Sequence, residues 1–294
     1  MKILRQILIS YGTNILLFVV PLICVGTISC SKQDVQYISP NTDEEIWLRE
    51  LTSPKYKGRV TGTVGCAMAK DYIITELQRL GYAPNVQTFN FDNSIIMNNI
   101  IVDIPGDIDS LVIIGAHYDG AIQSELYQAA TDNASGVVAL LSIAKFFGHA
   151  KYRTKLCFWD GEEFTGNSAF NGSKYFVDSS EDMEKTRWYC NLDCCGRLND
   201  DIYLYYSQTI QDLCCSAYDL VSSNSKQDFN ILKKNQDNEG SDYVSFINAG
   251  IPIWGWNDYS TLMFNHTIDD NIENVSIYKI QYVSSVTLRM LQYL

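Results

Sequence analysis

Two adjacent carboxylates, Glu162 and Glu163, follow a short apolar run in the segment KLCFWDGEE at residues 155–163. The apolar run has the pattern of a buried strand, and it stops at Asp160-Gly161. Negative charges grouped at the end of a buried strand cost free energy unless a positive charge lies beside them. A bound cation would supply that charge, so further metal ligands are expected elsewhere in the chain.

Only three histidines occur in the sequence, and two of them stand near acids. His117 lies in AHYDG, where Asp119 is placed to accept an imidazole N–H and fix the tautomer. His266 lies in NHTIDD, where Asp270 is a candidate for the same role. His149, in FFGHAKY, has no neighbouring acid and is expected at the surface, at the end of a helix. Imidazole and carboxylate ligands together favour Zn²⁺ over Mg²⁺ or Ca²⁺.

The elements that must position these residues alternate between strands and helices. Apolar and β-branched runs predict strands at 86–91, 94–105, 111–117, 155–159, 188–193, 201–206, 228–232 and 250–256. Helical periodicity predicts helices at 64–81, 133–147, 209–223, 241–248 and 274–294. This alternation predicts a single domain of the α/β class, with a mostly parallel twisted sheet and helices on both faces.

Parallel strands bring residues that are far apart in the sequence to one edge of a sheet. In such sheets the ligand site lies beyond the carboxyl ends of the strands. The candidate ligands follow predicted strands or precede a predicted helix: His117, Asp132, Glu163, Asp193 and His266. The sequence therefore predicts that they converge on one site.

Taken in order, five motifs resemble the M28-type zinc aminopeptidases with two co-catalytic metals: AHYDG, TDNASG (131–136), DGEE, NLD (191–193) and HTIDD. The resemblance also includes GRVTGT (58–63) and SDYVSFINAGIP (241–252), and it covers most of the chain. It implies the phosphorylase/hydrolase-like architecture of zinc exopeptidases. It also implies hydrolysis of the N-terminal residue of a peptide, or of a small substrate with an N-terminal amine.

Carried onto the matching positions, the resemblance implies two zinc ions. His117, Asp132 and Asp193 would bind one ion, and Asp132, Glu163 and His266 would bind the other. Asp132 would then bridge the two ions, which in two-metal hydrolases lie roughly 3.5–4 Å apart. A helix N-terminus after this residue favours its negative charge.

The two adjacent acids take different roles under this resemblance. Glu163 is a metal ligand, and Glu162 is the general base that takes a proton from the attacking water and passes it to the leaving amine. Asp119 counts both as a catalytic residue and, with Asp270, as an outer partner of the ligands. The resemblance also implies a cis peptide directly after the bridging acid.

Three features depart from the family pattern. FTGNSAFN at 164–171 lengthens the loop that precedes Gly172-Ser173. Tyr243 stands where a histidine is common, and Asn271 stands where a threonine often follows the last acid. No ligand is lost, but the longer loop leaves the substrate pocket open to interpretation.

Other functions on the same fold remain as alternatives. Glutaminyl-peptide cyclotransferases use one zinc ion, and DGEE followed by a longer loop resembles them. TDNASG and NLDCCGR fit the aminopeptidases better. A carboxypeptidase or N-deacylase is also open, because the sequence does not show whether the pocket holds a free amine or a carboxylate. A non-catalytic envelope binding domain is a further alternative, although such a domain would be expected to lose ligands.

The N-terminus predicts export. Residues 1–30 read as a lipoprotein-type signal peptide, with basic residues, an apolar stretch and Cys30 as the lipidated residue. An uncleaved membrane anchor is the alternative. Residues 31–42 would be a polar tether and 43–294 the peptidase domain, held in the cell envelope through the lipid alone. The net charge of −12 argues against nucleic acid as a partner. The sequence does not indicate an oligomeric state.

Nine cysteines occur, and seven of them follow Cys30. Because seven is odd, at least one is expected to be free or to form an intermolecular bond. Most are expected to be buried small side chains or disulfide partners.

Overall fold

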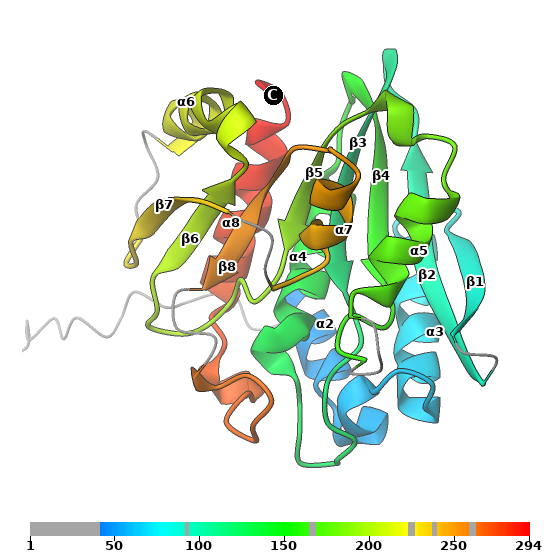
Figure 1. The fold of residues 1–294 in the computed structure, drawn as a ribbon. Coiled ribbons are helices and arrows are strands. Elements are labelled where there is room, and N and C mark those ends of the chain that lie inside the picture. The colour runs from blue at the N-terminus through cyan, green and yellow to red at the C-terminus, as the bar shows by residue number, and fades with distance from the viewer. Residues whose placement is uncertain (1–41, 92–93, 165–168, 223–226, 237–239, 259–262) are drawn as a thin grey trace, which may run out of the picture. The chain divides into compact units, whose positions relative to one another are not determined.

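The computed structural model describes residues 42–91, 94–164, 169–222, 227–236, 240–258 and 263–294 (Figure 1). Within these residues the strands form one eight-stranded sheet. In spatial order they are β1 (Asn85–Phe91), β2 (Ile95–Ile104), β4 (Tyr152–Trp159), β3 (Ile108–His117), β5 (Thr186–Leu192), β8 (Ile253–Asp258), β6 (Ile202–Tyr206) and β7 (Ile231–Asn235).

The centre of the sheet is parallel, as predicted. Strand β3 pairs in parallel with β4 and with β5, and β5 pairs in parallel with β8. The margins differ, because β2 runs antiparallel to both β1 and β4, and β6 runs antiparallel to β8. The short connection between β1 and β2 is one that only an antiparallel pair allows. The mixed margins leave the carboxyl ends of the four central strands at one edge.

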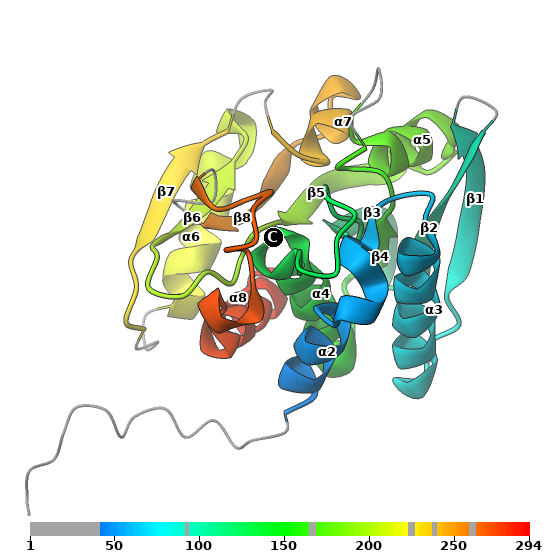
Figure 2. The ribbon, with the colours of Figure 1, turned by 90° about the horizontal axis from the view of Figure 1, so that it is seen from below.

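Helices cover both faces of the sheet (Figure 2). One face packs against α2 (Asp43–Leu51), α3 (Val64–Arg79), α4 (Gly136–Phe146), α6 (Gln211–Ser222) and α8 (Ile277–Met290). The other face packs against α5 (Asn171–Ser179) and α7 (Tyr243–Asn248). On that second face, Phe246 of α7 stacks on Tyr189 of β5 with ring centroids 3.8 Å apart. The predicted α/β architecture is therefore confirmed.

Several predicted elements need correction. Helix α4 begins at Gly136, later than the predicted start at residue 133, because residues 130–135 form an irregular turn. Strand β7 lies three residues further along the chain than predicted. Helices α2 and α5 have no counterpart in the sequence prediction. The apolar signal of α5 is weak, because Phe176 is its one fully buried apolar side chain.

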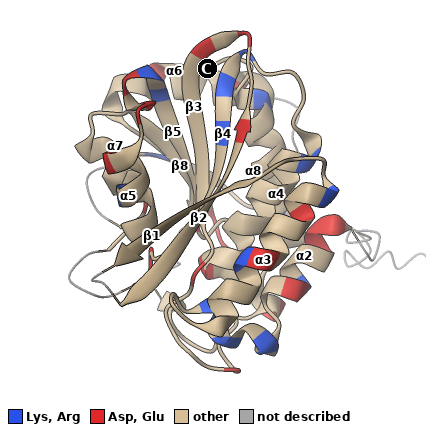
Figure 3. Ribbon diagram, turned by 90° about the vertical axis from the view of Figure 1, so that its right-hand side faces the viewer, with Lys and Arg blue, Asp and Glu red and all other residues tan. Residues whose placement is uncertain are grey.

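Acidic and basic residues both occur along the outer helices α2 and α3 (Figure 3). The side chain of His149 is 76% exposed, and its Nε2 lies 3.2 Å from Asp107. All seven cysteines in the described part of the chain are free thiols, and six of them are buried. They act as small core side chains rather than as disulfide partners.

The predicted signal peptide, Cys30 and nearly all of the predicted tether lie outside the described residues. Among the helices that the structure does describe, none is both long and apolar enough to cross a membrane.

Candidate metal centre

The predicted ligands gather at the carboxyl ends of the central strands. Strand β3 ends at His117, which pairs with Trp159 at the end of β4. The chain then runs on from β4 to Glu162 and Glu163, and Asp193 directly follows β5. Because β4, β3 and β5 are parallel neighbours, all these side chains reach the same edge of the sheet.

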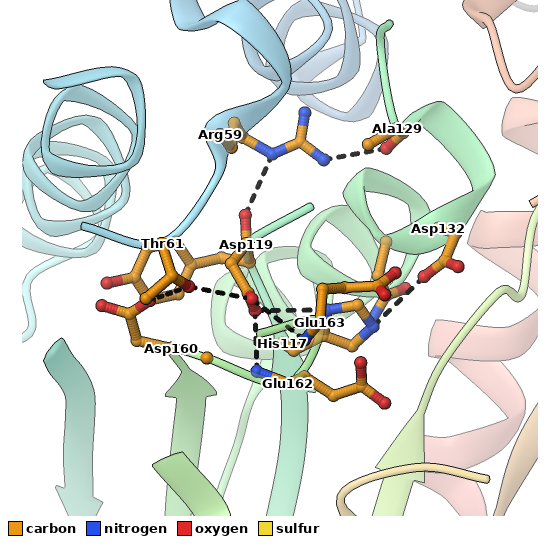
Figure 4. Close-up of polar contacts among 12 residues, drawn as sticks. Arg59, Thr61, His117, Asp119, Ala129, Asp132, Asp160, Glu162 and Glu163 are labelled. Atoms are coloured by element: carbon orange, nitrogen blue, oxygen red, sulfur yellow. Dashed lines mark hydrogen bonds and ion pairs between the residues drawn. The ribbon is translucent and has the colours of Figure 1, made fainter. Parts of the chain in front are cut away.

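One half of the centre is buried and surrounds His117. Its Nε2 lies 3.3 Å from Oδ1 of Asp132 and 3.4 Å from Oδ1 of Asp193 (Figure 4). The His117 side chain is 1% exposed, yet within the described residues neither of its ring nitrogens makes a hydrogen bond, and neither does Oδ1 of Asp193. Buried polar atoms without a hydrogen-bond partner are rare. An imidazole nitrogen between two carboxylate oxygens is a set of donors that fits a zinc ion.

The other half surrounds His266. Its Nε2 lies 2.8 Å from Oε1 of Glu163 and 3.5 Å from Oδ2 of Asp132. The His266 side chain is 51% exposed. Asp132 therefore faces His117 with one carboxylate oxygen and His266 with the other. All five predicted ligands are brought together, in the two groups that the resemblance implies.

Asp132 lies in the irregular turn at residues 130–135, where the peptide to Asn133 is cis. The Oδ1 of Asn133 accepts the N–H groups of Gly136 and Cys194, and its Nδ2 donates to Leu192 O. These bonds tie the turn to the start of α4 and to the end of β5. The backbone around Asp132 is therefore fixed by its bonds to the sheet, although Asp132 itself lies outside the strands.

Asp270 does not take the position that its nearness to His266 in the sequence suggested. Its two carboxylate oxygens accept the backbone N–H groups of Thr131, at 2.6 Å, and Asp132, at 3.1 Å. Within the described residues no hydrogen bond joins it to His266. Asp270 is buried, and its carboxylate holds the backbone of Asp132 instead of the imidazole of His266.

Asp119 lies beside His117 and beneath the two glutamates. Its Oδ1 is 3.5 Å from Nδ1 of His117. Its two oxygens accept the backbone N–H groups of Glu162, at 3.2 Å, and Glu163, at 3.1 Å (Figure 4). One buried carboxylate thus contacts His117 and Glu162 of the buried half and Glu163 of the other half.

Glu162 faces the buried half of the centre. One of its carboxylate oxygens lies within 4.8 Å of ligand atoms of His117 and Asp193. Glu163 instead groups with Asp132 and His266. The thiol of Cys194 also lies within 4.8 Å of carboxylate oxygens of Asp132 and Asp193. The two adjacent glutamates therefore diverge toward different halves.

The electrostatics of the site favour a bound cation. Burial raises the pKa of Glu162 well above its ordinary value, and the charges of Glu163 and Asp193 add to this effect against the opposing charge of His117. Burial, with the charge of Asp132, raises the pKa of Glu163 to about 8. Hydrogen bonds to carboxylates, first that of Asp132, raise the pKa of His266 to about 10. Ionised carboxylates packed this closely need further positive charge, which a divalent ion supplies.

Asp132 shows the opposite shift. Burial raises its pKa, but the neighbouring imidazoles of His117 and His266 outweigh burial and leave the pKa below its ordinary value. The two imidazoles thus favour the ionised form of Asp132, which is the form that binds a metal ion.

Four residues of the centre were not assigned a role from the sequence. Arg59 and Thr61 belong to GRVTGT, Asp160 precedes the two glutamates, and Asp242 belongs to SDY. Asp242 is fully buried with no hydrogen bond to either oxygen, and burial raises its pKa to about 7. The motifs signalled that these segments matter, but the residue types alone gave no specific chemistry.

The features that depart from the family pattern lie around the site. Residues 165–168 of the lengthened loop fall outside the described residues, and Phe164 packs edge-on against Phe91 with ring centroids 5.0 Å apart. The hydroxyl of Tyr243 accepts from Nε2 of Gln236 at 2.7 Å. Asn271 caps a short 3₁₀ helix that follows Asp270.

Comparison with known proteins finds a match to the model of Peptidase family M28 over residues 99–291. Leucine aminopeptidase 2 of Trichophyton equinum is 29% identical over 181 residues, which are 56% of this chain and 34% of that protein. The chain therefore spans about a third of the length of this curated relative.

Two solved structures share the fold. The glutaminyl cyclase of Porphyromonas gingivalis superimposes with a TM-score of 0.72 at 21% identity, covering 85% of this chain and 96% of that one. A zinc aminopeptidase of Bacillus subtilis superimposes with a TM-score of 0.71 at 14% identity, covering 84% and 93%. At these identities the likeness shows a common architecture, and the two scores do not separate the two activities.

Proposed function

The chain belongs to peptidase family M28, and from this premise we propose that it is a two-zinc exopeptidase that removes the N-terminal residue of peptides. The observation that carries the proposal is the orientation of Asp132. One of its oxygens faces Nε2 of His117 at 3.3 Å and the other faces Nε2 of His266 at 3.5 Å. A carboxylate held between two imidazoles is the arrangement that bridges two ions.

When bound, two zinc ions would lower the pKa of a water molecule and polarise the scissile carbonyl. His117, Asp132 and Asp193 would hold one ion, and Asp132, Glu163 and His266 the other. The surrounding protein keeps these ligands in place, since Asp119 contacts His117 and Asp270 fixes the backbone of Asp132.

Glu162 is the general base of this proposal. Its backbone N–H is held by Asp119, and one of its carboxylate oxygens lies within 4.8 Å of ligand atoms of His117 and Asp193. The family resemblance leaves Glu162 outside both sets of ligands and assigns it the role of base. It takes a proton from the attacking water and delivers it to the amine that leaves. A carboxylate in a buried, water-poor site is well suited to hold that proton between the two steps.

Glutaminyl-peptide cyclotransferase is the second candidate, since the fold accommodates that activity in other proteins. That reaction would need one zinc ion and no attacking water. The complete pair of histidines around Asp132 favours the two-ion hydrolase. A carboxypeptidase or N-deacylase on the same fold is a third candidate.

Metal analysis combined with a substrate panel tests the proposal. Purified protein should bind two zinc ions, hydrolyse aminoacyl p-nitroanilides and release free amino acid from a peptide that begins with glutamine. Release of ammonia from the same peptide, with one ion bound, would instead identify the cyclotransferase. Absence of both reactions would contradict both candidates and leave the carboxypeptidase, N-deacylase and binding-domain alternatives.

We further propose that the protein is exported and lipid-anchored through Cys30. The order of basic residues, apolar stretch and cysteine supports this. Metabolic labelling with a fatty acid should mark the natural protein and leave Cys30→Ser unlabelled. Equal labelling of both proteins would contradict the assignment.

A further inference from the structure

Thr61 lies buried between two carboxylates next to the metal centre (Figure 4). Its Oγ1 is 3.0 Å from Oδ2 of Asp119 and 2.9 Å from Oδ1 of Asp160. Two buried carboxylates this close to one hydroxyl repel each other. The hydroxyl lies between them and can hydrogen-bond a carboxylate oxygen on either side. A hydrocarbon side chain of the same size would fill the space but would leave those oxygens without this partner.

Asp119 is the residue through which Thr61 reaches the site. The same Oδ2 that meets the Thr61 hydroxyl also accepts the N–H of Glu163, at 3.1 Å. Its Oδ1 accepts the N–H of Glu162 and lies 3.5 Å from Nδ1 of His117. A shift of this one carboxylate would therefore move the candidate base and two ligands together.

The far side of the pair is fixed as well. Oδ2 of Asp160 accepts the N–H of Asn98 at 2.9 Å, and its Oδ1 lies 3.5 Å from Sγ of Cys66. Asp160 is thus held on strand β2 and helix α3. Because these contacts restrain Asp160, loss of the hydroxyl between the two acids should also act on Asp119, whose other contacts lead to the metal centre.

Arg59 anchors the segment that carries Thr61. This buried guanidinium donates to the carbonyl oxygen of Tyr118, at 3.0 Å, and to that of Ala129, at 2.8 Å. Tyr118 directly precedes Asp119, and Ala129 directly precedes the turn that carries Asp132. Thr61 is therefore presented to Asp119 by a segment that is bonded to both ligand-bearing loops.

We propose that Thr61 is a positioning residue of the metal centre, which acts through Asp119 on Glu162 and Glu163. The kinetic part of this inference rests on the proposed function, and the metal-binding part does not. Thr61 contacts none of the five candidate ligands directly. Removal of its hydroxyl should therefore lower zinc affinity and turnover by about 10–100-fold, as is typical of residues that hold the ligands in place.

The test compares Thr61→Val and Thr61→Ser in the purified protein, with Thr63→Val as the matched control. The Thr63 hydroxyl donates to Val60 O at 2.6 Å and accepts the N–H of Cys66 at 3.3 Å, so it caps helix α3. Its removal should lower Tm by about 2–4 °C without reaching Asp119. Turnover is measured on L-leucine p-nitroanilide, and zinc affinity by competition with a chromophoric chelator.

Thr61→Val should lower kcat about 10–100-fold with KM nearly unchanged, and should weaken zinc affinity by a similar factor. Thr61→Ser should restore both, and Thr63→Val should change neither. If Thr61→Val does not fold, Thr61→Ala removes the same hydroxyl and carries the test.

Three results would overturn the proposal: unchanged zinc affinity in Thr61→Val, equal losses in Thr61→Val and Thr63→Val, or no recovery in Thr61→Ser. If the natural protein hydrolyses no aminoacyl substrate, the proposed function fails, and the zinc titration still decides the role of Thr61.

Discussion

The two halves of the metal centre are built from the same kinds of side chain but on different supports. His117 ends a central strand that is paired on both sides, and its side chain is 1% exposed. His266 follows β8 on a connecting segment, has a left-handed backbone with φ of 57°, and is 51% exposed. The sheet holds the first half, whereas a loop holds the second. Loops carry the variable and mobile parts of binding sites.

Hydrogen bonds link the loop half to the sheet half through the turn that carries Asp132. Both Asp270 oxygens hold the backbone of that turn, and the N–H of Ile272 donates to Oε1 of Gln128 at 2.8 Å. The segment after His266 is therefore hydrogen-bonded to the turn that carries Asp132. We expect the buried half to set the chemistry and the exposed half to set how readily an ion and a substrate enter.

The largest expected effect separates the two adjacent glutamates. Glu162→Gln removes the base of the buried half and should lower kcat by roughly 10²–10⁴-fold while both zinc ions stay bound. Glu163→Gln removes a ligand of the exposed half and should lower the zinc content instead. Steady-state kinetics and metal analysis on the same preparations check both outcomes. Near-normal turnover in Glu162→Gln would remove the general-base assignment.

The histidines test the difference in support directly. His117→Ala and His266→Ala should each weaken zinc binding by more than the roughly 10–100-fold that an outer partner costs. In the metal-free protein His117→Ala should lower Tm by more than His266→Ala, because it leaves a cavity among buried groups. Zinc titration and thermal unfolding in EDTA give the two readouts. Equal Tm losses would mean that the halves do not differ in their support.

The outer acids offer a finer comparison. Asp119→Asn and Asp270→Asn each place an amide where a carboxylate accepts two backbone N–H groups. Each should weaken zinc binding by roughly 10–100-fold. Asp119→Asn should act on turnover as well, since it disturbs the backbone of Glu162. Asp270→Asn should act mainly on affinity. A larger kcat loss in Asp270→Asn than in Asp119→Asn would reverse the proposed division of roles.

The sequence predicts the five candidate ligands well, but it does not predict which residue Asp270 contacts. Apolar runs that end in His117, Glu163 and Asp193 read as parallel strands, and parallel strands bring their ends together whatever the loops do. The place of Asp270 could not be read in this way. Its nearness to His266 along the chain suggested contact, whereas its carboxylate bonds a turn 138 residues away in sequence.

Residues that act through backbone atoms also leave little trace in a single sequence. Arg59 works by donating to carbonyl oxygens, and every residue has one, so no partner type signals its role. Thr61 needs two acids that only the fold brings beside it. Helices α2 and α5 were missed because each is short, and periodicity over a single pair of turns is weak evidence.

The smallest expected effect is the contribution of the exposed half to the pH dependence of stability. In the metal-free protein the pKa of Glu163 is about 8, above the ordinary 4.5. Between these two values the folded protein keeps a proton that the unfolded chain has lost, so the stability falls as pH rises through this range. The pKa of His266 is about 10, above the ordinary 6.5, so its stabilising contribution is complete below 6.5 and is lost as pH rises through 10. Both shifts therefore predict that the Tm of the EDTA-treated protein falls as pH rises from about 5 to about 10.

Zinc should reverse this trend, because the ion needs an ionised Glu163 and a neutral His266 and so binds more tightly as pH rises. Thermal unfolding at several pH values, with EDTA or with zinc, measures both slopes. The double variant Glu163→Gln/His266→Ala removes both groups and should make the metal-free slope less steep, whereas His117→Ala leaves those two groups in place. If the double variant keeps the slope of the natural protein, the pH response arises elsewhere, and the exposed half is no more sensitive to protons than the buried one.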